Sequence, residues 1–315
     1  MINVLVTGAN GFMGRNLKAN LLAQKPGLVN VMCFDLDTSD QKLSEYCGLA
    51  DFVFHLAGVN RPQNKEEFYE GNTELTEKVL NALERQENLC PILMSSSSQA
   101  LLDNDYGKSK QQAENALFAY GEKQRTPVYV YRLPGVFGKW CRPNYNSVVA
   151  TFCYNIAHSK QVDVNGRETS LKLVYIDDVI KEFFAAMDGR PNLNNSGFCE
   201  VSPTYDTTLG ELIDMIRAFK DSRETLSVPN ALNSFEKKLY STYLSYLPED
   251  GFSYTLKTRF LSLSRPTAPA PVSRRPRYTV WRCAAGCAAA GYTRRRWRYP
   301  PGAPSPSYTL CPPRR

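Results

Sequence analysis

The chain has 315 residues, 43% of them apolar and 22% charged, and no apolar stretch approaches the roughly 20 residues that a membrane-spanning helix needs. Its net charge of +7 is uneven, because residues 258–315 hold 12 arginines and no lysine or acid, which leaves residues 1–257 with a net charge of −5. The body of the chain therefore gives no sign of a nucleic-acid or membrane surface, and its two histidines exclude a histidine-rich metal site.

The N-terminus lacks the basic, apolar and small-residue regions of an export signal, because the first predicted strand already begins at Ile2. We therefore expect a cytoplasmic protein. Six of the nine cysteines lie within residues 1–257, without paired metal-ligand spacing. A disulfide framework is not expected in a cytoplasmic chain of this size.

Short apolar runs alternate with longer amphipathic stretches, the pattern of a parallel sheet covered by helices. The predicted strands are Ile2–Thr7, Asn30–Asp35, Phe52–His55, Ile92–Ser96 and Val128–Arg132. The predicted helices are Met13–Gln24, Glu66–Gln86, Tyr106–Tyr120, Tyr145–Ala157 and Leu209–Phe219, the last with a capping box at Thr208 and Glu211.

The fold class that follows is α/β, with a Rossmann-type doubly wound parallel sheet whose ligand crevice lies at the carboxyl ends of the strands. We expect a dinucleotide-binding core at about residues 1–142 and a smaller substrate lobe mainly at about 143–257. Residues 258–315 hold 10 of the 20 prolines and only arginine as charge. This composition favours a disordered or frame-shifted tail over a basic nucleic-acid arm.

A glycine-rich motif, Gly8-Ala9-Asn10-Gly11-Phe12-Met13-Gly14, follows the first strand and opens a helix. Glycine permits a tight turn that a pyrophosphate can approach, and the helix N-terminus supplies N–H donors to the phosphates. Asp35 ends the second strand 21 residues after Gly14, where a carboxylate can bind the adenosine ribose. This combination predicts dinucleotide binding.

A second motif, Tyr106-Gly107-Lys108-Ser109-Lys110, places a phenol and an ammonium on one helical face, because residues four apart are neighbours there. A nearby ammonium, helped by the positive charge of an oxidised nicotinamide, favours the phenolate and should lower the pKa of Tyr106 toward the range useful for proton exchange. The motif follows a strand that ends in Ser95-Ser96-Ser97-Ser98, where a hydroxyl can hold a substrate oxygen opposite the tyrosine.

A third motif, Asp51–Gly58, contains a buried strand followed by Leu56-Ala57-Gly58, which leaves space for a cofactor. His55 lies inside the apolar run, so we expect a packed strand residue rather than a catalyst. Asn72 lies in the next helical region and is predicted to brace this turn.

Together these motifs resemble extended short-chain dehydrogenases of the NAD-dependent epimerase/dehydratase family that act on nucleotide sugars. The runs Leu56–Pro62, Phe137–Ser147 and Leu239–Pro248 are more specifically similar to the reductase domain of bifunctional capsular polysaccharide enzymes that make UDP-N-acetyl-6-deoxy-talosamine, a precursor of UDP-N-acetyl-fucosamine. The resemblance covers Met1 to about Lys257. The residues after it are too few for the C-terminal cupin epimerase domain of those enzymes, and they contain no histidine.

The resemblance implies NADPH-dependent reduction of the 4-keto group of a UDP-2-acetamido-2,6-dideoxy-hexos-4-ulose in capsule or O-antigen precursor synthesis, by a homodimer. It implies that Tyr106 supplies the proton, Lys110 binds the nicotinamide ribose and Ser97 orients the carbonyl. The cofactor-binding candidates are Gly8, Asn10, Gly11, Phe12, Met13, Gly14, Asp35, Leu56, Ala57, Gly58, Asn72 and Lys110. The substrate-binding candidates are Asn60, Arg61, Ser98, Arg142, Asn144, Asn146 and Ser147.

Three questions stay open at this point. The segment Phe34-Asp35-Leu36-Asp37 is acidic where a 2′-phosphate needs a base, so local chemistry favours NADH while the resemblance favours NADPH. The reaction could instead be that of a 4-epimerase or a 4,6-dehydratase, although Ser98-Gln99 lacks the acids usual in a dehydratase. A non-catalytic dinucleotide-sensing or scaffold protein is the third possibility, against which the intact Ser97, Tyr106 and Lys110 count. An inactive dinucleotide-binding truncation product also stays open, because the second domain of the related enzymes is lacking.

Overall fold

The computed structural model describes residues 1–227 and 233–252, all of which belong to one unit, Met1–Lys257. The predicted tail at 258–315 lies outside the described residues. A five-stranded parallel sheet has the order β2-β1-β3-β4-β5. Its strands are β1 (Ile2–Thr7), β2 (Val29–Phe34), β3 (Phe52–His55), β4 (Ile92–Ser97) and β5 (Val128–Leu133).

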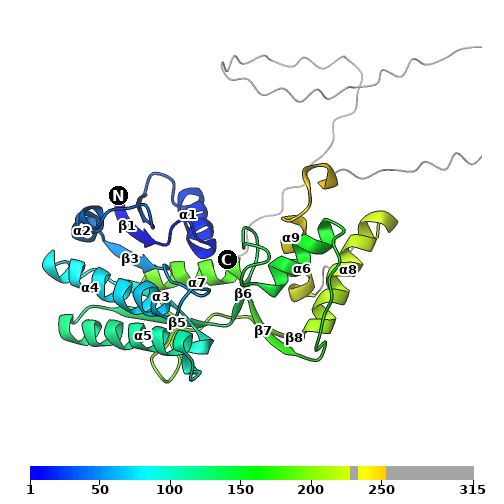
Figure 1. The fold of residues 1–315 in the computed structure, drawn as a ribbon. Coiled ribbons are helices and arrows are strands. Elements are labelled where there is room, and N and C mark those ends of the chain that lie inside the picture. The colour runs from blue at the N-terminus through cyan, green and yellow to red at the C-terminus, as the bar shows by residue number, and fades with distance from the viewer. Residues whose placement is uncertain (228–232, 253–315) are drawn as a thin grey trace, which may run out of the picture. The chain divides into compact units, whose positions relative to one another are not determined.

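Helices cover both faces of this sheet. Successive residues of each strand point to opposite sides, so the apolar residues of one strand belong to two different cores. Val4 and Val6 of β1 join a core with the helices α1 (Phe12–Gln24) and α7 (Ile176–Met187). Leu5, between them, joins a second core with α2 (Asp40–Leu49), α4 (Leu75–Arg85) and α5 (Asp105–Gln124). Figure 1 shows α4 and α5 side by side on their face of the sheet. The expected doubly wound α/β fold is confirmed.

A smaller lobe is built on a three-stranded sheet of order β6-β7-β8, formed by β6 (Gly135–Phe137), β7 (Ser170–Tyr175) and β8 (Thr204–Thr208). The helices α6 (Val148–Ala157), α8 (Leu209–Thr225) and α9 (Ser234–Leu244) gather around it (Figure 1). Their shared core includes the buried Phe137, Ile213 and Tyr243. No helix in residues 1–227 or 233–252 is long and apolar enough to cross a membrane.

The five predicted strands agree with the structure to within one residue at each end, and the predicted capping box at Thr208 and Glu211 is present. The predicted helix Glu66–Gln86 is wrong as one element. It is divided into α3 (Glu66–Phe68), a π-helical turn η1 (Tyr69–Glu74) and α4.

The predicted helix Tyr145–Ala157 begins three residues late, at Val148, because the Ser147 hydroxyl accepts the Ala150 N–H as an N-cap and Asn144 has a φ of 54°. The short 3₁₀ turns η2 (Ser98–Leu101) and η3 (Glu249–Phe252) and the elements α2, α7, α9 and β6–β8 have no counterpart in the sequence-based expectation. Although α7 lies beyond the expected core of 1–142, it packs on the larger sheet.

Candidate active site

A cleft of about 1630 Å³ opens at the carboxyl ends of the larger sheet. Its walls come from the turn after β1, the segments that follow β3 and β4, the first turns of α5, the loop 139–147 and part of β7. This is the edge at which doubly wound sheets bind their ligands.

The glycine turn forms one end of this cleft. Gly8 has a φ of 66°, and a Cβ on it would lie 2.8 Å from both the N and the Cα of Ala57, so only glycine fits. A Cβ on Gly14 would collide with the carbonyl oxygen of Gly8. Because glycine has no Cβ, α1 can pack close against the turn that follows β1. The N-cap of α1 is Gly11, which has no side chain to cap the helix. Phe12 and Met13 line the cleft, so the first N–H groups of α1 and the positive end of the helix dipole lie at its wall, an arrangement that favours an anionic ligand.

Asp35 lies just behind this turn and does not line the cleft. One of its carboxylate oxygens accepts the Asn10 N–H at 2.7 Å and the other accepts the Leu36 N–H at 3.0 Å. The carboxylate is therefore already bound to the backbone of the glycine turn and helps to fix its conformation.

Tyr106 occupies the first turn of α5, whose N-cap is Asn104; the Asn104 side chain accepts the Gly107 N–H at 2.7 Å. The Tyr106 ring is half-buried, with its centroid 5.6 Å from that of Phe68. Burial raises the pKa of Tyr106, and a hydrogen bond with the Ser97 hydroxyl opposes this. The lowering expected from Lys110 together with an oxidised nicotinamide stays a prediction.

Lys110 follows one helical turn later and is only 8% exposed. Burial lowers its pKa to about 8, while the Glu114 carboxylate acts in the opposite direction. Its ammonium faces the cleft, and no hydrogen bond to it is found in the described part of the chain. A buried cation without a hydrogen-bond partner is prepared to bind an oxygen of a ligand.

Glu114 lies one further turn along α5 and is 1% exposed. Its carboxylate accepts hydrogen bonds from Arg132 Nε, at 3.0 and 3.1 Å to its two oxygens, from Arg132 Nη2 at 2.5 Å, and from the Ser96 hydroxyl at 2.5 Å. The guanidinium of Arg132 in turn stacks on the Phe198 ring at 3.7 Å. This buried pair fastens α5 to the ends of β4 and β5, directly beside Ser97. The sequence reasoning missed it, although Glu114 shares a helical face with Tyr106 and Lys110.

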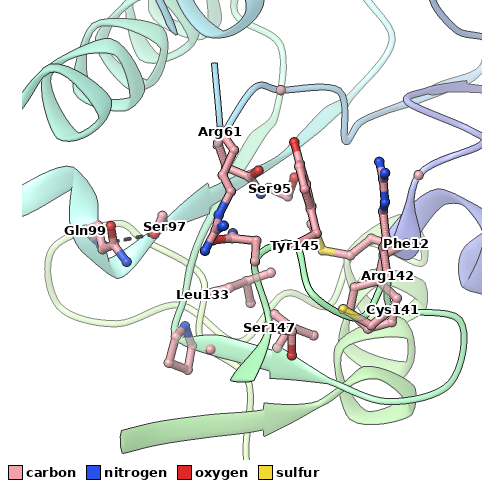
Figure 2. Close-up of a pocket in the computed structure, with 18 of the residues that line it drawn as sticks. Phe12, Arg61, Ser95, Ser97, Gln99, Leu133, Cys141, Arg142, Tyr145 and Ser147 are labelled. Carbon is pink, nitrogen blue, oxygen red and sulfur yellow. Dashed lines mark hydrogen bonds between the residues drawn. The ribbon is translucent and has the colours of Figure 1, made fainter. Parts of the chain in front are cut away.

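Two cations from separate segments meet in the cleft around Tyr145. Arg61 and Arg142 lie 5.9 and 5.1 Å from the Tyr145 ring centre (Figure 2). Within residues 1–227 and 233–252, no acidic side chain forms an ion pair with either guanidinium. Uncompensated guanidiniums in a concave site favour an anionic ligand.

The structure brings most of the predicted residues to one cleft. Tyr106, Lys110 and Ser97 line it, as do all the substrate-binding candidates, namely Asn60, Arg61, Ser98, Arg142, Asn144, Asn146 and Ser147. So do the cofactor-binding candidates other than Asp35, Ala57 and Asn72. Ala57 donates its N–H to the Thr7 hydroxyl, and the Asn72 amide bonds both backbone groups of Val59, so these two residues shape the wall from behind.

Further lining residues were not singled out from the sequence, among them Arg15, Trp140 and Lys172. Arg15 lies 5.3 Å from the Trp140 ring centre. Arg15 directly follows the glycine motif and Trp140 lies within the run Phe137–Ser147, but only the fold brings the loop 139–147 opposite the start of α1.

These features define a dinucleotide-binding α/β protein with a tyrosine–lysine pair in its cleft. Residues 4–196 match the NAD dependent epimerase/dehydratase family, and the chain belongs to this family. It is 48% identical over 253 residues to UDP-2-acetamido-2,6-beta-L-arabino-hexul-4-ose reductase of Pseudomonas aeruginosa, a match that spans 80% of this chain and 67% of the relative. The resemblance drawn from the motifs is thereby confirmed.

Solved structures agree with this placement. The capsular polysaccharide assembling protein CapF from Staphylococcus aureus superposes with a TM-score of 0.74 at 44% identity, over 81% of this chain and 67% of that protein. The Bordetella bronchiseptica enzyme WbmF in complex with NAD+ has a TM-score of 0.63 at 20% identity, over 78% of this chain and 92% of that protein. At that identity WbmF shares the fold alone.

Proposed function

We propose that this protein reduces the 4-keto group of a UDP-2-acetamido-2,6-dideoxy-hexos-4-ulose with a nicotinamide dinucleotide as reductant, in the synthesis of capsule or O-antigen precursors. The observation that carries the proposal is the 48% identity over 253 residues to a reductase whose name specifies a UDP-linked 4-keto sugar. The cleft supplies the groups that such a reaction needs.

The residues at one end of the cleft fit a dinucleotide. Gly8 and Gly14 leave room for a pyrophosphate against the backbone, and the N–H groups of Phe12 and Met13 are oriented to bind it. Gly58 lets the Lys110 ammonium approach the wall of the cleft closely, and there the ammonium would bind the hydroxyls of the nicotinamide ribose. When bound, the reduced nicotinamide supplies the hydride that the carbonyl carbon accepts. Asp35 beside Asn10 favours NADH, the family resemblance favours NADPH, and the proposal covers both.

The proton comes from Tyr106. Its phenol donates to the C4 oxygen as that oxygen gains negative charge, and the Ser97 hydroxyl donates a second hydrogen bond to the same atom. The product is then a secondary alcohol and the tyrosine is left as a phenolate. The Lys110 ammonium, one helical turn away, stabilises this phenolate. Because burial alone raises the pKa of Tyr106, proton transfer requires that ammonium to be charged.

The nucleotide end of the substrate would lie against Arg61 and Arg142, whose guanidiniums can each bind a phosphate oxygen. Asn60, Ser98, Asn144, Asn146 and Ser147 line the same part of the cleft and offer hydrogen bonds to the sugar. The homodimer implied by the resemblance stays a prediction.

A 4-epimerase of the same fold is the second candidate, and the UDP-glucuronic acid 4-epimerase from Bacillus cereus shares this fold at 18% identity and a TM-score of 0.64. That identity is too low to indicate the reaction. The two activities differ in stoichiometry, because a reductase consumes one dinucleotide per product and an epimerase consumes none.

The test is to incubate the full chain with UDP-4-keto-6-deoxy-HexNAc and either NADPH or NADH, with and without a separate 3-epimerase, and to follow dinucleotide absorbance and product mass. We expect oxidation of one dinucleotide per sugar reduced. Sugar turnover without dinucleotide oxidation would favour the epimerase. Absence of turnover in a chain that still binds dinucleotide would favour the inactive product.

A further inference from the structure

A buried chain of hydrogen bonds runs behind the cleft through His55. This residue lies on β3 and is 3% exposed. Its Nδ1 is 2.8 Å from the hydroxyl oxygen of Thr7 and its Nε2 is 2.9 Å from that of Thr76, both of which are also buried. The imidazole therefore bridges the end of β1 and the start of α4.

The donors and acceptors along this chain determine where its protons lie. The Thr76 hydroxyl donates to the carbonyl oxygen of Asn72 at 2.6 Å, so it can only accept from His55, and Nε2 must carry a hydrogen. A neutral imidazole protonated at Nε2 has an acceptor at Nδ1, to which the Thr7 hydroxyl donates. The Thr7 oxygen then accepts the Ala57 N–H at 3.2 Å.

The alternative protonation states leave polar atoms unpaired. With the hydrogen on Nδ1, the Thr7 hydroxyl would have no acceptor, and Thr76 could satisfy either Nε2 or the Asn72 carbonyl but not both. The imidazolium fails at Thr7 for the same reason. Burial, with the nearby Lys110 as a smaller influence, also lowers the pKa of His55 to about 3.

Each end of this series of hydrogen bonds reaches a wall of the cleft. At one end, Thr7 precedes Gly8, and the Ala57 backbone is the surface against which Gly8 packs. At the other end, the Asn72 amide bonds the N–H and C=O of Val59 and donates to the Ser109 hydroxyl at 3.0 Å. Ser109 in turn donates to the carbonyl oxygen of Tyr106 at 2.9 Å.

We propose that His55 is a positioning residue, held as the neutral tautomer with hydrogen on Nε2, that fixes the glycine turn and the helix of Tyr106 and Lys110 relative to each other. The hydrogen bond to Thr7 holds the glycine turn in place against Ala57. The hydrogen bond to Thr76 holds the segment around Asn72, which in turn contacts the helix of Tyr106. The functional part of this inference rests on the proposed dinucleotide site; the tautomer does not.

The tautomer is tested by ¹⁵N NMR of the full chain labelled at histidine. The sequence has only His55 and His158, so a His158→Gln variant assigns both signals. We expect His55 to show a protonated Nε2 and an unprotonated Nδ1, unchanged from about pH 5 to about pH 8. A hydrogen on Nδ1, or titration within that range, would overturn the assignment.

The positioning role is tested by a double-mutant cycle on the dissociation constant of NADPH or NADH, whichever the wild-type chain binds. His55→Leu and Thr7→Val should each weaken binding at least about tenfold, and the double variant should lose little more, because both remove the same arm. His55→Asn places an amide oxygen near the Nδ1 position, so it should keep dinucleotide affinity within about threefold while lowering kcat.

Thr126→Val is the matched control, because Thr126 is a buried threonine whose hydroxyl bonds the Leu89 carbonyl away from the cleft. It should leave the dissociation constant unchanged. Wild-type affinity in a folded His55→Leu chain would end the positioning role. If that variant does not fold, wild-type affinity of Thr7→Val would end it equally. Failure of the wild-type chain to bind any dinucleotide would instead count against the proposed function.

Discussion

The ammonium of Lys110 occupies the space that Gly58 leaves open: a Cβ at position 58 would lie 2.8 Å from Lys110 Nζ and 2.8 Å from Asn72 Oδ1. The wall of the cleft after β3 and the helix α5 therefore approach as closely as a glycine allows. This approach brings the lysine next to the segment that we propose to hold the cofactor.

Lys110 makes the stability of the fold depend on pH. Burial lowers its pKa from 10.5 to about 8, so the unfolded chain binds more protons than the folded chain between these values. The contribution of Lys110 to the free energy of unfolding is therefore lowest at a pH below its folded-state pKa of about 8. This contribution increases by about 3 kcal/mol as the pH rises to the unfolded-state pKa of 10.5.

The Lys110→Met variant should accordingly be the more stable protein near neutral pH, by up to about 3 kcal/mol, and lose this advantage once the pH reaches the unfolded-state pKa of 10.5. Urea unfolding of the wild-type chain and the variant, near neutral pH and at about pH 10.5, measures the difference in the free energy of unfolding. A gap of equal size at both pH values would mean that Lys110 is not a buried, strained cation. The same variant should lose turnover.

Gly8 should be essential for dinucleotide binding. A Gly8→Ala change combines a φ of 66° with a Cβ 2.8 Å from the Ala57 backbone, and should cost about 2–5 kcal/mol and abolish binding of the dinucleotide. Gly27 provides the control, because its φ is 71° but a Cβ there meets nothing within 4 Å. Gly27→Ala should cost only about 1 kcal/mol and bind normally. Equal behaviour of the two variants in thermal melts and fluorescence titration would refute the close packing at Gly8.

How far the sequence predicts the site depends on the distance over which each contact acts. The glycine turn and the pairing of Tyr106 with Lys110 are local, because a strand–helix turn and an i,i+4 spacing each specify their own geometry. The strands were located because continuous apolar runs mark buried parallel strands.

Contacts between distant segments could not be predicted. The pairing of Glu114 with Arg132 depends on the register of β4 against β5, and the position of α7 on the larger sheet depends on the path of the whole chain. The π-helical turn Tyr69–Glu74 differs from the predicted regular helix, because a hydrophobic pattern does not distinguish i→i+5 from i→i+4 hydrogen bonding. The hydrogen bond from the Asn10 N–H to Asp35 was also not predicted, and the role of Asp35 as a ribose ligand stays a prediction.

The buried ion pair of Glu114 and Arg132 should contribute more to the free energy of unfolding than an exposed ion pair does. Glu114→Gln leaves the guanidinium of Arg132 without its charged partner, and should destabilise the fold by about 3–5 kcal/mol. Glu84, which pairs with Lys123 while 40% exposed, is the matched comparison, and Glu84→Gln should cost less than about 1 kcal/mol. Similar losses from both substitutions in denaturant unfolding would contradict the role of burial.

Arg61 and Arg142 should affect the nucleotide sugar and leave the dinucleotide unaffected. Arg61→Met and Arg142→Met should each raise KM for the sugar nucleotide at least about tenfold, because each removes a charge-assisted contact to phosphate. The dissociation constant of the dinucleotide should not change. Arg190→Met, which removes an exposed arginine paired with Asp188, is the control. An unchanged KM in both cleft variants would mean that the phosphates of the sugar nucleotide do not bind to Arg61 and Arg142.

Proton transfer by Tyr106 is the step on which the proposed reaction depends, and its phenol is therefore the group to remove. Turnover of UDP-4-keto-6-deoxy-HexNAc and dinucleotide affinity should be measured together for the wild-type chain, Tyr106→Phe and Tyr120→Phe, the last a buried tyrosine of the same helix whose hydroxyl reaches Asn88 away from the cleft. We predict that Tyr106→Phe loses at least about 10²-fold in kcat with an unchanged dissociation constant, and that Tyr120→Phe keeps both values. Full turnover by Tyr106→Phe would contradict the proposed mechanism.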